Sequence, residues 1–197
     1  PATVHTLAPG IRVDMLPRPQ QVNIQQRFRK EGTPMYEKYG PLPPEQEGLT
    51  LKVIRNLSKN QDLAQIAALD TFLGNADRSK PNLFYWALCN YFTGIDQASI
   101  LRFNLISVAL RQINRLQKSD LSLQEQEGLR FYRDTLRHLQ ENYPLDRIEM
   151  LLDQQAEIAG LLNNEDVAQR MRFHKRMERE NLQGLPDLLE ALDAIVS

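Results

Sequence analysis

Cysteine is nearly absent from this sequence, because Cys89 is the only one among 197 residues. A single cysteine excludes an intrachain disulfide and a cysteine-based zinc cage, and it suits a reducing compartment. No apolar run approaches the roughly 20 residues that a helix needs to cross a bilayer. No basic-then-apolar signal segment opens the chain either. We therefore expect a cytoplasmic protein without a transmembrane segment.

An excess of charge of one sign is also lacking. The 24 Lys and Arg residues nearly balance the 25 Asp and Glu residues, which leaves a formal net charge of −1. Such a chain has no general attraction for nucleic acid or for an anionic membrane, so we expect no nucleic-acid partner. The length suits one full domain with a core. The sequence begins at Pro1 without an initiator Met, and we take it for a piece of a longer protein.

Proline divides the chain into two parts. Residues 1–48 hold eight of the eleven prolines, and interior prolines interrupt helices. We expect extended loops there, a hinge segment with one short helix over residues 24–30. Residues 49–197 read as a helical unit, and the two parts together make one domain. Helices are expected at residues 49–56, 104–117, 122–142, 144–161 and 185–196. A further helix should run from Ser58 or Asn60 to Gly74, and another should start at Asn164 or Asp166.

Two short aromatic and apolar runs interrupt the helical pattern. Residues 82–86 and 91–95 are separated by the turn sequence Ala-Leu-Cys-Asn, which predicts a small β-hairpin. The expected fold class is therefore mainly α, a helical bundle with one hairpin.

The residues that carry chemistry lie around this hairpin. Phosphoryl transfer needs a carboxylate that orients the attacking hydroxyl, and hard oxygen ligands for Mg²⁺. Asp77 is followed five residues later by Asn82, the spacing of the catalytic Asp and the metal-binding Asn in protein kinases. Asp96 follows the second run, and a hairpin brings its far end back beside its start. The alternative is a loop in which Asp77 and Asn82 cap turns and Asp96 ends a strand.

The sequence Leu-Gly-Asn-x-Asp-Arg-x-x-x-Asn-Leu-Phe at residues 73–84, followed by Ile-Asp at 95–96, resembles a known family. It is similar to the core of the phosphatidylinositol 3/4-kinase-like and HipA-like kinases, especially kinase-like effectors of intracellular bacteria such as Legionella. Residues 25–39 and the helical tail with Tyr143-Pro144 and 151–160 extend the likeness over nearly the whole chain, as a kinase-like C-lobe. The resemblance implies ATP and Mg²⁺ as cofactors, Asp77 as catalytic residue, and Asn82 and Asp96 as metal ligands.

The same resemblance implies a protein or phosphoinositide hydroxyl as acceptor, and a place in the host cytosol after secretion. Two departures from the family pattern count against activity. Ser79 stands where related sequences often have His, and Lys80 replaces only part of that positive charge. Upstream of Asp77 there is no Gly-rich loop and no strand Lys, so the nucleotide-covering N-lobe is missing. On the resemblance, residues 4–11 would be the strand and hinge that joined this lobe. We expect little turnover from this fragment; the alternative is a non-catalytic, pseudokinase-type scaffold.

Other polar residues have supporting or peripheral roles in this interpretation. Asn75 would support the catalytic-loop backbone, and Arg78 would partner Asp70 near a helix C-terminus. A cationic stripe lies at helical spacing and could hold a polyanion such as an inositol phosphate, or a host factor. The alternative is a solvated face balanced by Glu178 and Glu180. The stripe consists of Arg172, Lys175, Arg176 and Arg179.

Overall fold

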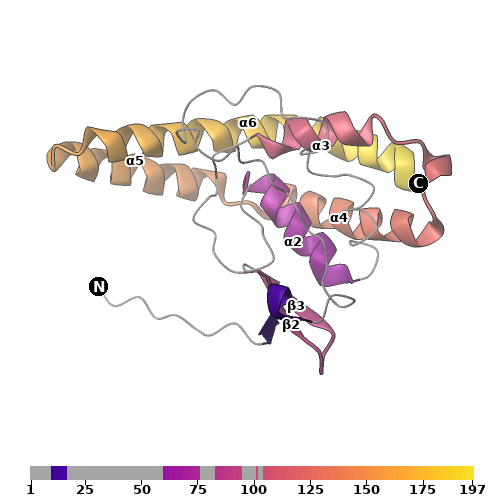
Figure 1. Ribbon diagram of the computed structural model, residues 1–197. Helices are drawn as coiled ribbons and strands as arrows, with labels where there is room; N and C mark the ends of the chain where they lie inside the picture. The colour runs from indigo at the N-terminus through magenta and orange to yellow at the C-terminus, as the bar shows by residue number, and fades with distance from the viewer. Residues whose placement is uncertain (1–9, 17–59, 76–82, 95–100, 102–103) are drawn as a thin grey trace.

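The computed structural model describes residues 10–16, 60–75, 83–94, 101 and 104–197. This part of the chain is mainly helical, with five α-helices and one small antiparallel sheet of three strands (Figure 1). The predicted domain division at residue 48 lies outside the described residues, as do the helices predicted over 24–30 and 49–56. The mainly α architecture with a hairpin is confirmed.

Helix α2, Gln61–Phe72, is the predicted helix that precedes the candidate loop. The side chain of Asn60 caps its start by accepting a hydrogen bond of 2.7 Å from the Asp62 amide. Leu63, Ala64, Ala67 and Ala68 are fully buried. Gly74 has a φ of 61°, a left-handed conformation that costs a glycine little and ends the helix.

The predicted hairpin is present as β2, Leu83–Trp86, and β3, Tyr91–Gly94. Leu83 pairs with Gly94 at its open end and Trp86 pairs with Tyr91 beside the turn. A third strand, β1 at Ile11–Arg12, pairs antiparallel with β2. The resemblance implied a strand and hinge over residues 4–11, of which 4–9 lie outside the described residues. Two residues are too few to show strand periodicity, so this pairing depends on contacts distant in sequence.

Gly10 explains how β1 can reach β2. A Cβ atom at this position would lie 2.5 Å from the carbonyl oxygen of Tyr85, and the φ of Gly10 is 107°. Only a residue without a side chain fits so close to the neighbouring backbone. The short 3₁₀ turn η1, Val13–Met15, follows β1 and buries Val13 in the core.

The remaining helices form a bundle around α6, Glu165–Val196, the longest helix of the described chain. Helix α3, Leu105–Ile113, and helix α4, Leu123–Asn142, pack on its C-terminal half, and α2 packs on α4. Helix α5, Leu145–Leu161, packs antiparallel along the first half of α6 (Figure 1). Helix α5 and residues 165–180 of α6 thus form a two-helix arm that projects from the bundle.

One hydrophobic core joins α2, α3, α4 and the C-terminal half of α6. The largest fully buried side chains are Leu63, Leu83, Ile106, Ile113, Leu129, Tyr132, Leu136 and Leu185. Gly184 lets α3 and α6 approach closely, since a Cβ atom there would lie 3.2 Å from Cγ2 of Ile106. Burying this much apolar surface is the main favourable contribution to the fold.

The sequence predicted some helix starts correctly. The capping box of Ser122 and Glu125 opens α4, Asn104 caps α3, and Asn164 caps α6 through its side chain. Pro144 precedes the first residue of α5, as its missing N–H favours.

Two predicted helix ends were wrong. Helix α3 stops at Ile113 and not at residue 117, because the amides of Arg115 and Leu116 bond to carbonyls three residues back and tighten the last turn. The 3₁₀ turn η5, Lys118–Asp120, follows. The second error is larger: the predicted separate helix over 185–196 does not exist, because α6 runs without a break from Glu165 to Val196.

Pro186 lies inside this continuous helix, near the start of the separate helix that was predicted over residues 185–196. Proline has no N–H for the carbonyl four residues earlier, and its ring crowds the preceding turn. The residues on either side, Leu185, Leu188 and Leu189, are buried in the core. Burying a leucine contributes about 1.5–3 kcal/mol, so tertiary packing outweighs the local cost of the proline.

Pro186→Ala should therefore stabilise the protein. Alanine restores the hydrogen bond to the Leu182 carbonyl and keeps the exposed position small, so we expect the free energy of unfolding to rise by about 1–3 kcal/mol. Urea unfolding followed by circular dichroism measures this change, with Asp187→Ala as the neighbouring exposed control. A loss of stability in Pro186→Ala would contradict the account of a locally unfavourable proline.

Candidate functional site

Most residues of the predicted phosphate-and-metal site lie outside the described part of the chain. Asp77, Arg78, Lys80, Asn82 and Asp96 fall in the segments 76–82 and 95–100. Their predicted roles stay predictions. The structure does describe Asn75 and all four ends of these two segments, and so it gives the frame from which both segments start.

The first segment leaves from the C-terminal end of α2, where Asn75 and Asp70 are joined by two hydrogen bonds. The side-chain Nδ2 of Asn75 donates to Oδ1 of Asp70 at 2.8 Å, and its backbone amide donates to the Asp70 carbonyl at 2.8 Å. Both residues are buried, with 0% and 1% exposure. The predicted contact of Asn75 with the catalytic-loop backbone stays a prediction; the described contact of its side chain is with this carboxylate.

The second segment returns to the same helix end. The amide of Leu101 donates to the carbonyl of Leu73 at 2.5 Å, and the Leu101 side chain is buried. At the other side, both segments join the open end of the hairpin, where Leu83 pairs with Gly94. Asn82 directly precedes Leu83, and Asp96 follows Gly94 by two residues. The two candidate segments therefore share both of their anchoring points.

The hairpin is tied to the start of α2 by side chains. Oδ2 of Asp62 accepts a hydrogen bond of 3.1 Å from the amide of Phe92, and Nδ2 of Asn60 donates to the carbonyl of Asn90 at 2.6 Å. These bonds satisfy backbone groups along the outer edge of β3, which would otherwise be open to pairing. The same two polar residues that start α2 therefore also fix the position of the hairpin.

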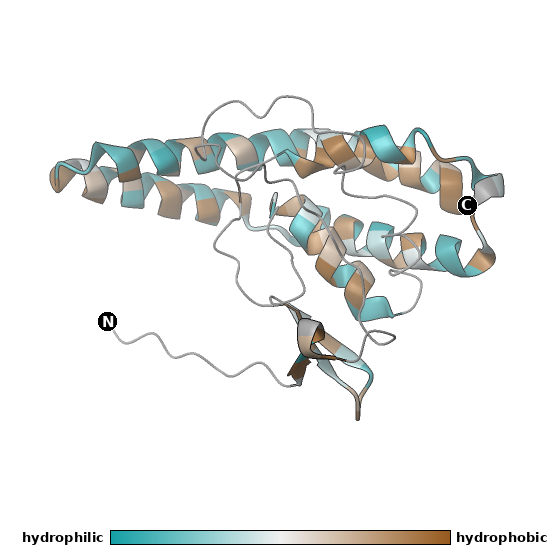
Figure 2. Ribbon diagram, in the orientation of Figure 1, coloured by the Kyte–Doolittle hydropathy of each residue, from teal (hydrophilic) through white to brown (hydrophobic). Residues whose placement is uncertain are grey.

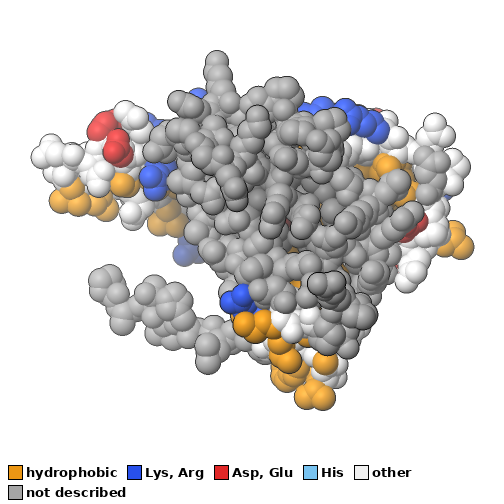
Figure 3. All heavy atoms as spheres, viewed as in Figure 1, with side chains coloured by type: hydrophobic (Ala, Val, Ile, Leu, Met, Phe, Trp, Pro, Cys, Tyr) orange, Lys and Arg blue, Asp and Glu red, His pale blue; other side chains and the backbone are white. Residues whose placement is uncertain are grey.

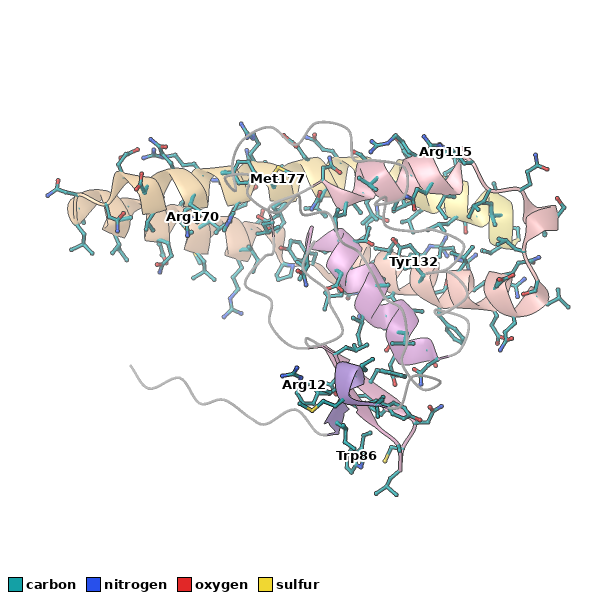
Figure 4. The ribbon with its side chains drawn as sticks, viewed as in Figure 1. Arg12, Trp86, Arg115, Tyr132, Arg170 and Met177 are labelled. Atoms are coloured by element: carbon teal, nitrogen blue, oxygen red, sulfur yellow. The ribbon has the colours of Figure 1, made fainter. Side chains whose placement is uncertain are left out.

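Behind the Asp70–Asn75 pair lies a buried hydroxyl pair that the sequence did not reveal. Tyr132 of α4 points toward α2 and donates to Oγ1 of Thr71 at 2.8 Å, and Thr71 donates to the Ala67 carbonyl at 2.8 Å (Figure 4). Burial and, to a lesser extent, the nearby Asp70 carboxylate raise the pKa of Tyr132. The phenol therefore stays neutral and acts as a donor. A tyrosine at a core position of an amphipathic helix gives no separate sequence signal.

The cationic stripe lies on the arm, and each of its members faces an acid. Nε and Nη2 of Arg179 bind the two carboxylate oxygens of Glu149, and Nζ of Lys175 binds Asp153 at 2.5 Å. Arg172 pairs with Glu165 at 3.0 Å, and Arg176 lies 3.7 Å from Glu180. A polyanion would have to compete with these acids. The pairing of Arg179 and Lys175 with α5 has a structural purpose, because it joins the two helices of the arm.

Glu178 does not balance this stripe on a solvated face, as the alternative interpretation supposed. Its side chain is buried, it accepts a hydrogen bond from the Tyr143 hydroxyl, and its Oε2 has no hydrogen-bond partner in the described structure. Burial raises the pKa of Glu178, and the repulsion from Glu149 adds to this; the bond from Tyr143 and the charges of Arg179 and Lys175 oppose it. Glu178 therefore holds its proton to a higher pH than an exposed glutamate.

No three His, Cys, Asp or Glu side chains among the described residues are grouped so as to hold a metal ion. No helix in the described part is long and apolar enough to cross a membrane.

No protein-family model, no curated protein and no solved structure matches this chain.

Removing the Asn75 amide should destabilise the protein, because it leaves the buried Asp70 carboxylate with one donor fewer. We expect Asn75→Ala to cost about 1–3 kcal/mol of unfolding free energy. Chemical denaturation measures the loss, and Asn114→Ala, at an exposed asparagine of similar helix-end context, serves as the control. Equal stability of the two variants would show that the Asp70–Asn75 bond contributes nothing to the fold.

Glu178 should make stability depend on pH. Its folded-state pKa is raised above the ordinary value of 4.5, so its contribution is fully present below pH 4.5 and is lost as the pH rises through the raised value. Glu178→Gln removes this titration, and its stability relative to wild type should increase from acid to neutral pH. Urea unfolding at a series of pH values tests this, with the exposed Glu180→Gln as control. Parallel pH profiles for wild type and Glu178→Gln would contradict the prediction.

Proposed function

We propose that this chain is the phosphate- and metal-handling lobe of a kinase-type phosphotransferase, which uses ATP and Mg²⁺ to phosphorylate a hydroxyl. The observation that carries the proposal is the set of Asp77, Asn82 and Asp96 in two segments that share both anchoring points, the end of α2 and the open end of the β2–β3 hairpin. Two segments that share both anchoring points suit a reaction in which positioning and charge neutralisation supply most of the catalysis.

Each residue has a role that its chemistry supports. The carboxylate of Asp77 would accept a hydrogen bond from the attacking hydroxyl and orient it toward the terminal phosphorus of ATP. The side-chain oxygens of Asn82 and Asp96 are hard ligands of the kind that Mg²⁺ prefers. The ammonium group of Lys80 would offset phosphate charge as a flexible point charge. Bound Mg²⁺ would neutralise the charge on the transferred phosphoryl group.

The described frame supports this proposal through its buried hydrogen bonds and its strand pairing. Segment 76–82 starts at a buried carboxylate–amide pair and ends in a strand whose partner leads to Asp96. Catalytic groups need support from packed, hydrogen-bonded neighbours to keep a productive geometry. The Asp70–Asn75 bonds and the Leu73–Leu101 bond supply such support at the end of α2.

ATP would need a second protein element to cover it. The sequence upstream of Asp77 contains no Gly-rich loop and no strand lysine of the kinase type, and Ser79 supplies no imidazole. We therefore propose that turnover requires a nucleotide-covering element beyond these residues, and that this chain in isolation turns over little. The acceptor is a protein or phosphoinositide hydroxyl in this proposal, and a cytoplasmic setting, including a host cytosol, suits it.

A second candidate is a non-catalytic binding module with a kinase-like fold. The observation that favours it is the apolar surface of the sheet: Trp86 and Tyr91 are exposed at a cross-strand pair, and Leu88 in the turn is 89% exposed (Figures 3 and 4). Apolar side chains gathered in this way mark a surface that contacts another molecule. The same surface suits the kinase proposal as well as the binding module, because a nucleotide-covering element would also need a surface on which to dock.

Phosphoryl transfer by the longest native form of the protein separates the two candidates. We expect Asp77→Ala to lose on the order of 2–4 kcal/mol of transition-state stabilisation, which is roughly 30- to 1,000-fold in rate. Transfer of radiolabelled phosphate from ATP to candidate protein and phosphoinositide acceptors measures it, with Asp166→Ala, at an exposed aspartate of the arm, as the control. Equal rates for wild type and Asp77→Ala would refute the enzyme and leave the binding module.

A Mg²⁺ titration followed by NMR tests the metal ligands separately from turnover. In wild type, the amide signals of Asn82 and Asp96 should shift when Mg²⁺ is added. In the Asp96→Ala variant, the amide signal of Asn82 should stay unchanged. Absence of any shift at millimolar Mg²⁺, with and without ATP, would contradict the proposed ligands.

A further inference from the structure

Two buried oxygen atoms on neighbouring side chains of α6 lack a hydrogen-bond partner. Glu178 and Asn181 are 2% and 1% exposed, yet Oε2 of Glu178 and Oδ1 of Asn181 bond to nothing in the described part of the chain. They lie just after Met177, where α6 leaves the largely hydrophilic arm and enters the more hydrophobic bundle (Figures 2 and 4). A buried polar atom without a partner is costly, so both oxygens need a donor.

The two side chains belong to one closed ring of contacts. The other carboxylate oxygen of Glu178, Oε1, accepts from the Tyr143 hydroxyl, and Nδ2 of Asn181 donates to the Phe72 carbonyl at 2.9 Å. The aromatic rings of Phe72 and Tyr143 meet edge-on, with centroids 4.8 Å apart. Residues three apart on a helix have Cβ atoms about 5–6 Å apart. The unpartnered oxygens therefore belong to adjacent side chains whose other polar atoms are already bound.

Both unpartnered oxygens are acceptors when Glu178 is ionised, so they cannot bond to each other in that state. One proton on Oε2 removes the conflict, because a carboxyl O–H can donate to Oδ1 of Asn181 while Oε1 still accepts from Tyr143. Burial and the bond to Glu178 raise the pKa of Tyr143, so this phenol keeps its own proton and stays a donor. A single added proton thus satisfies two buried atoms.

The surrounding charges do not compensate an ionised Glu178. Lys175 and Arg179 attract it, but they already bind acids of α5, and Glu149 of that helix repels it. Burial has the largest influence and raises the pKa of Glu178. A neutral acid avoids the cost of a buried ion with one neutral donor. The titratable groups on the elements that meet here are Tyr143 of the α4–α5 turn, Glu149 and Asp153 of α5, Asp70 of α2, and His174, Lys175 and Arg179 of α6.

We propose that Glu178 and Asn181 form a proton-binding site, in which the proton joins Oε2 of Glu178 to Oδ1 of Asn181. With the proton in place, Nδ2 of Asn181 binds the Phe72 carbonyl, as the structure shows. Without it, the ionised Oε2 can only accept, so it draws Nδ2 of Asn181 toward itself and the amide turns away from Phe72. Each state of Glu178 selects one orientation of a single side-chain amide.

This site controls a contact between α6 and α2. The Asn181 side chain bonds to the last residue of α2, and loss of the proton breaks that bond. Because the folded-state pKa of Glu178 is raised, the contact is present below the ordinary value of 4.5 and is lost as the pH rises through the raised value. The residues of the site all lie in the described part of the chain, so the site stands independently of the proposed phosphotransferase activity.

NMR of the isotope-labelled full chain from about pH 4 to about pH 9, the range around a raised glutamate pKa, tests the site. The carboxyl carbon of Glu178 should titrate above the ordinary 4.5 of a glutamate. The Nδ2 signal of Asn181 and the carbonyl-carbon signal of Phe72 should shift with the same midpoint, because the hydrogen bond between them is lost. The through-hydrogen-bond coupling between these two atoms should disappear above that midpoint.

Glu178→Gln is the decisive variant, because glutamine keeps a donor at every pH. Its Nε2 can donate to Oδ1 of Asn181 while its Oε1 accepts from Tyr143. The Asn181 and Phe72 signals should therefore stay at their low-pH positions throughout. Two controls should keep the wild-type transition: Glu180→Gln, at an exposed glutamate two residues further along α6, and His174→Gln, at a half-buried histidine one turn before Glu178. Thermal unfolding confirms that each variant is folded.

A shared midpoint in wild type that Glu178→Gln abolishes and both controls keep supports the proposal. A Glu178 carboxyl that titrates no higher than an exposed glutamate would overturn it, and this is the result expected if a bound water bridges the two oxygens. A Glu178 carboxyl that does not titrate in this range would also overturn it. So would Asn181 and Phe72 signals that stay constant through the Glu178 transition, a transition that persists in Glu178→Gln, or loss of all native signals at the midpoint.

Discussion

The structure around the candidate site depends on one buried contact, the amide of Asn75 against the carboxylate of Asp70. A carboxylate near the C-terminal end of a helix is unfavourable in itself, because it adds negative charge where unsatisfied carbonyls already gather. Burial makes it still more costly unless donors surround it. Asn75 supplies one such donor and, with its backbone amide, also folds the chain back over the last turn of α2. This contact therefore fixes the position of Asn75, the last described residue before the candidate segment.

The charges of the arm illustrate a different relation between sequence and structure. Four cations at helical spacing look like a binding surface when α6 is considered alone. Once α5 lies beside it, Arg179 meets Glu149, 30 positions away, and Lys175 meets Asp153, 22 positions away. Exposed ion pairs contribute little individually, yet a row of them fixes the register and direction of two helices whose apolar contact is narrow. The first role of the cationic stripe is therefore to join the two helices of the arm.

The sequence predicted features that local chemistry determines. Asn60, Ser122 and Asn164 cap helices through their own side chains, and the two aromatic runs form the hairpin as expected. The prediction from sequence failed where contacts between residues distant in the chain determine the secondary structure. Burial of Leu185 and Leu188 carries α6 through Pro186, and β1 exists only because β2 is there to pair with it. Of the loop residues of the candidate site, Asn75 alone is described, and its contact is with Asp70; its support of the catalytic-loop backbone remains a prediction. Asp77, Asn82 and Asp96 keep the standing of a sequence-based prediction.

The continuity of α6 has a mechanical consequence. A helix of 32 residues is a stiff rod about 48 Å long, and its two halves lie in different surroundings, one in the arm and one in the core. Between them, Asn181 donates a hydrogen bond of 2.9 Å to the carbonyl of Phe72, the last residue of α2. The bond therefore ties the helix, at the point where the arm meets the core, to a residue three positions before Asn75. One side-chain hydrogen bond thus links the helix that carries the arm to the turn from which the candidate loop departs.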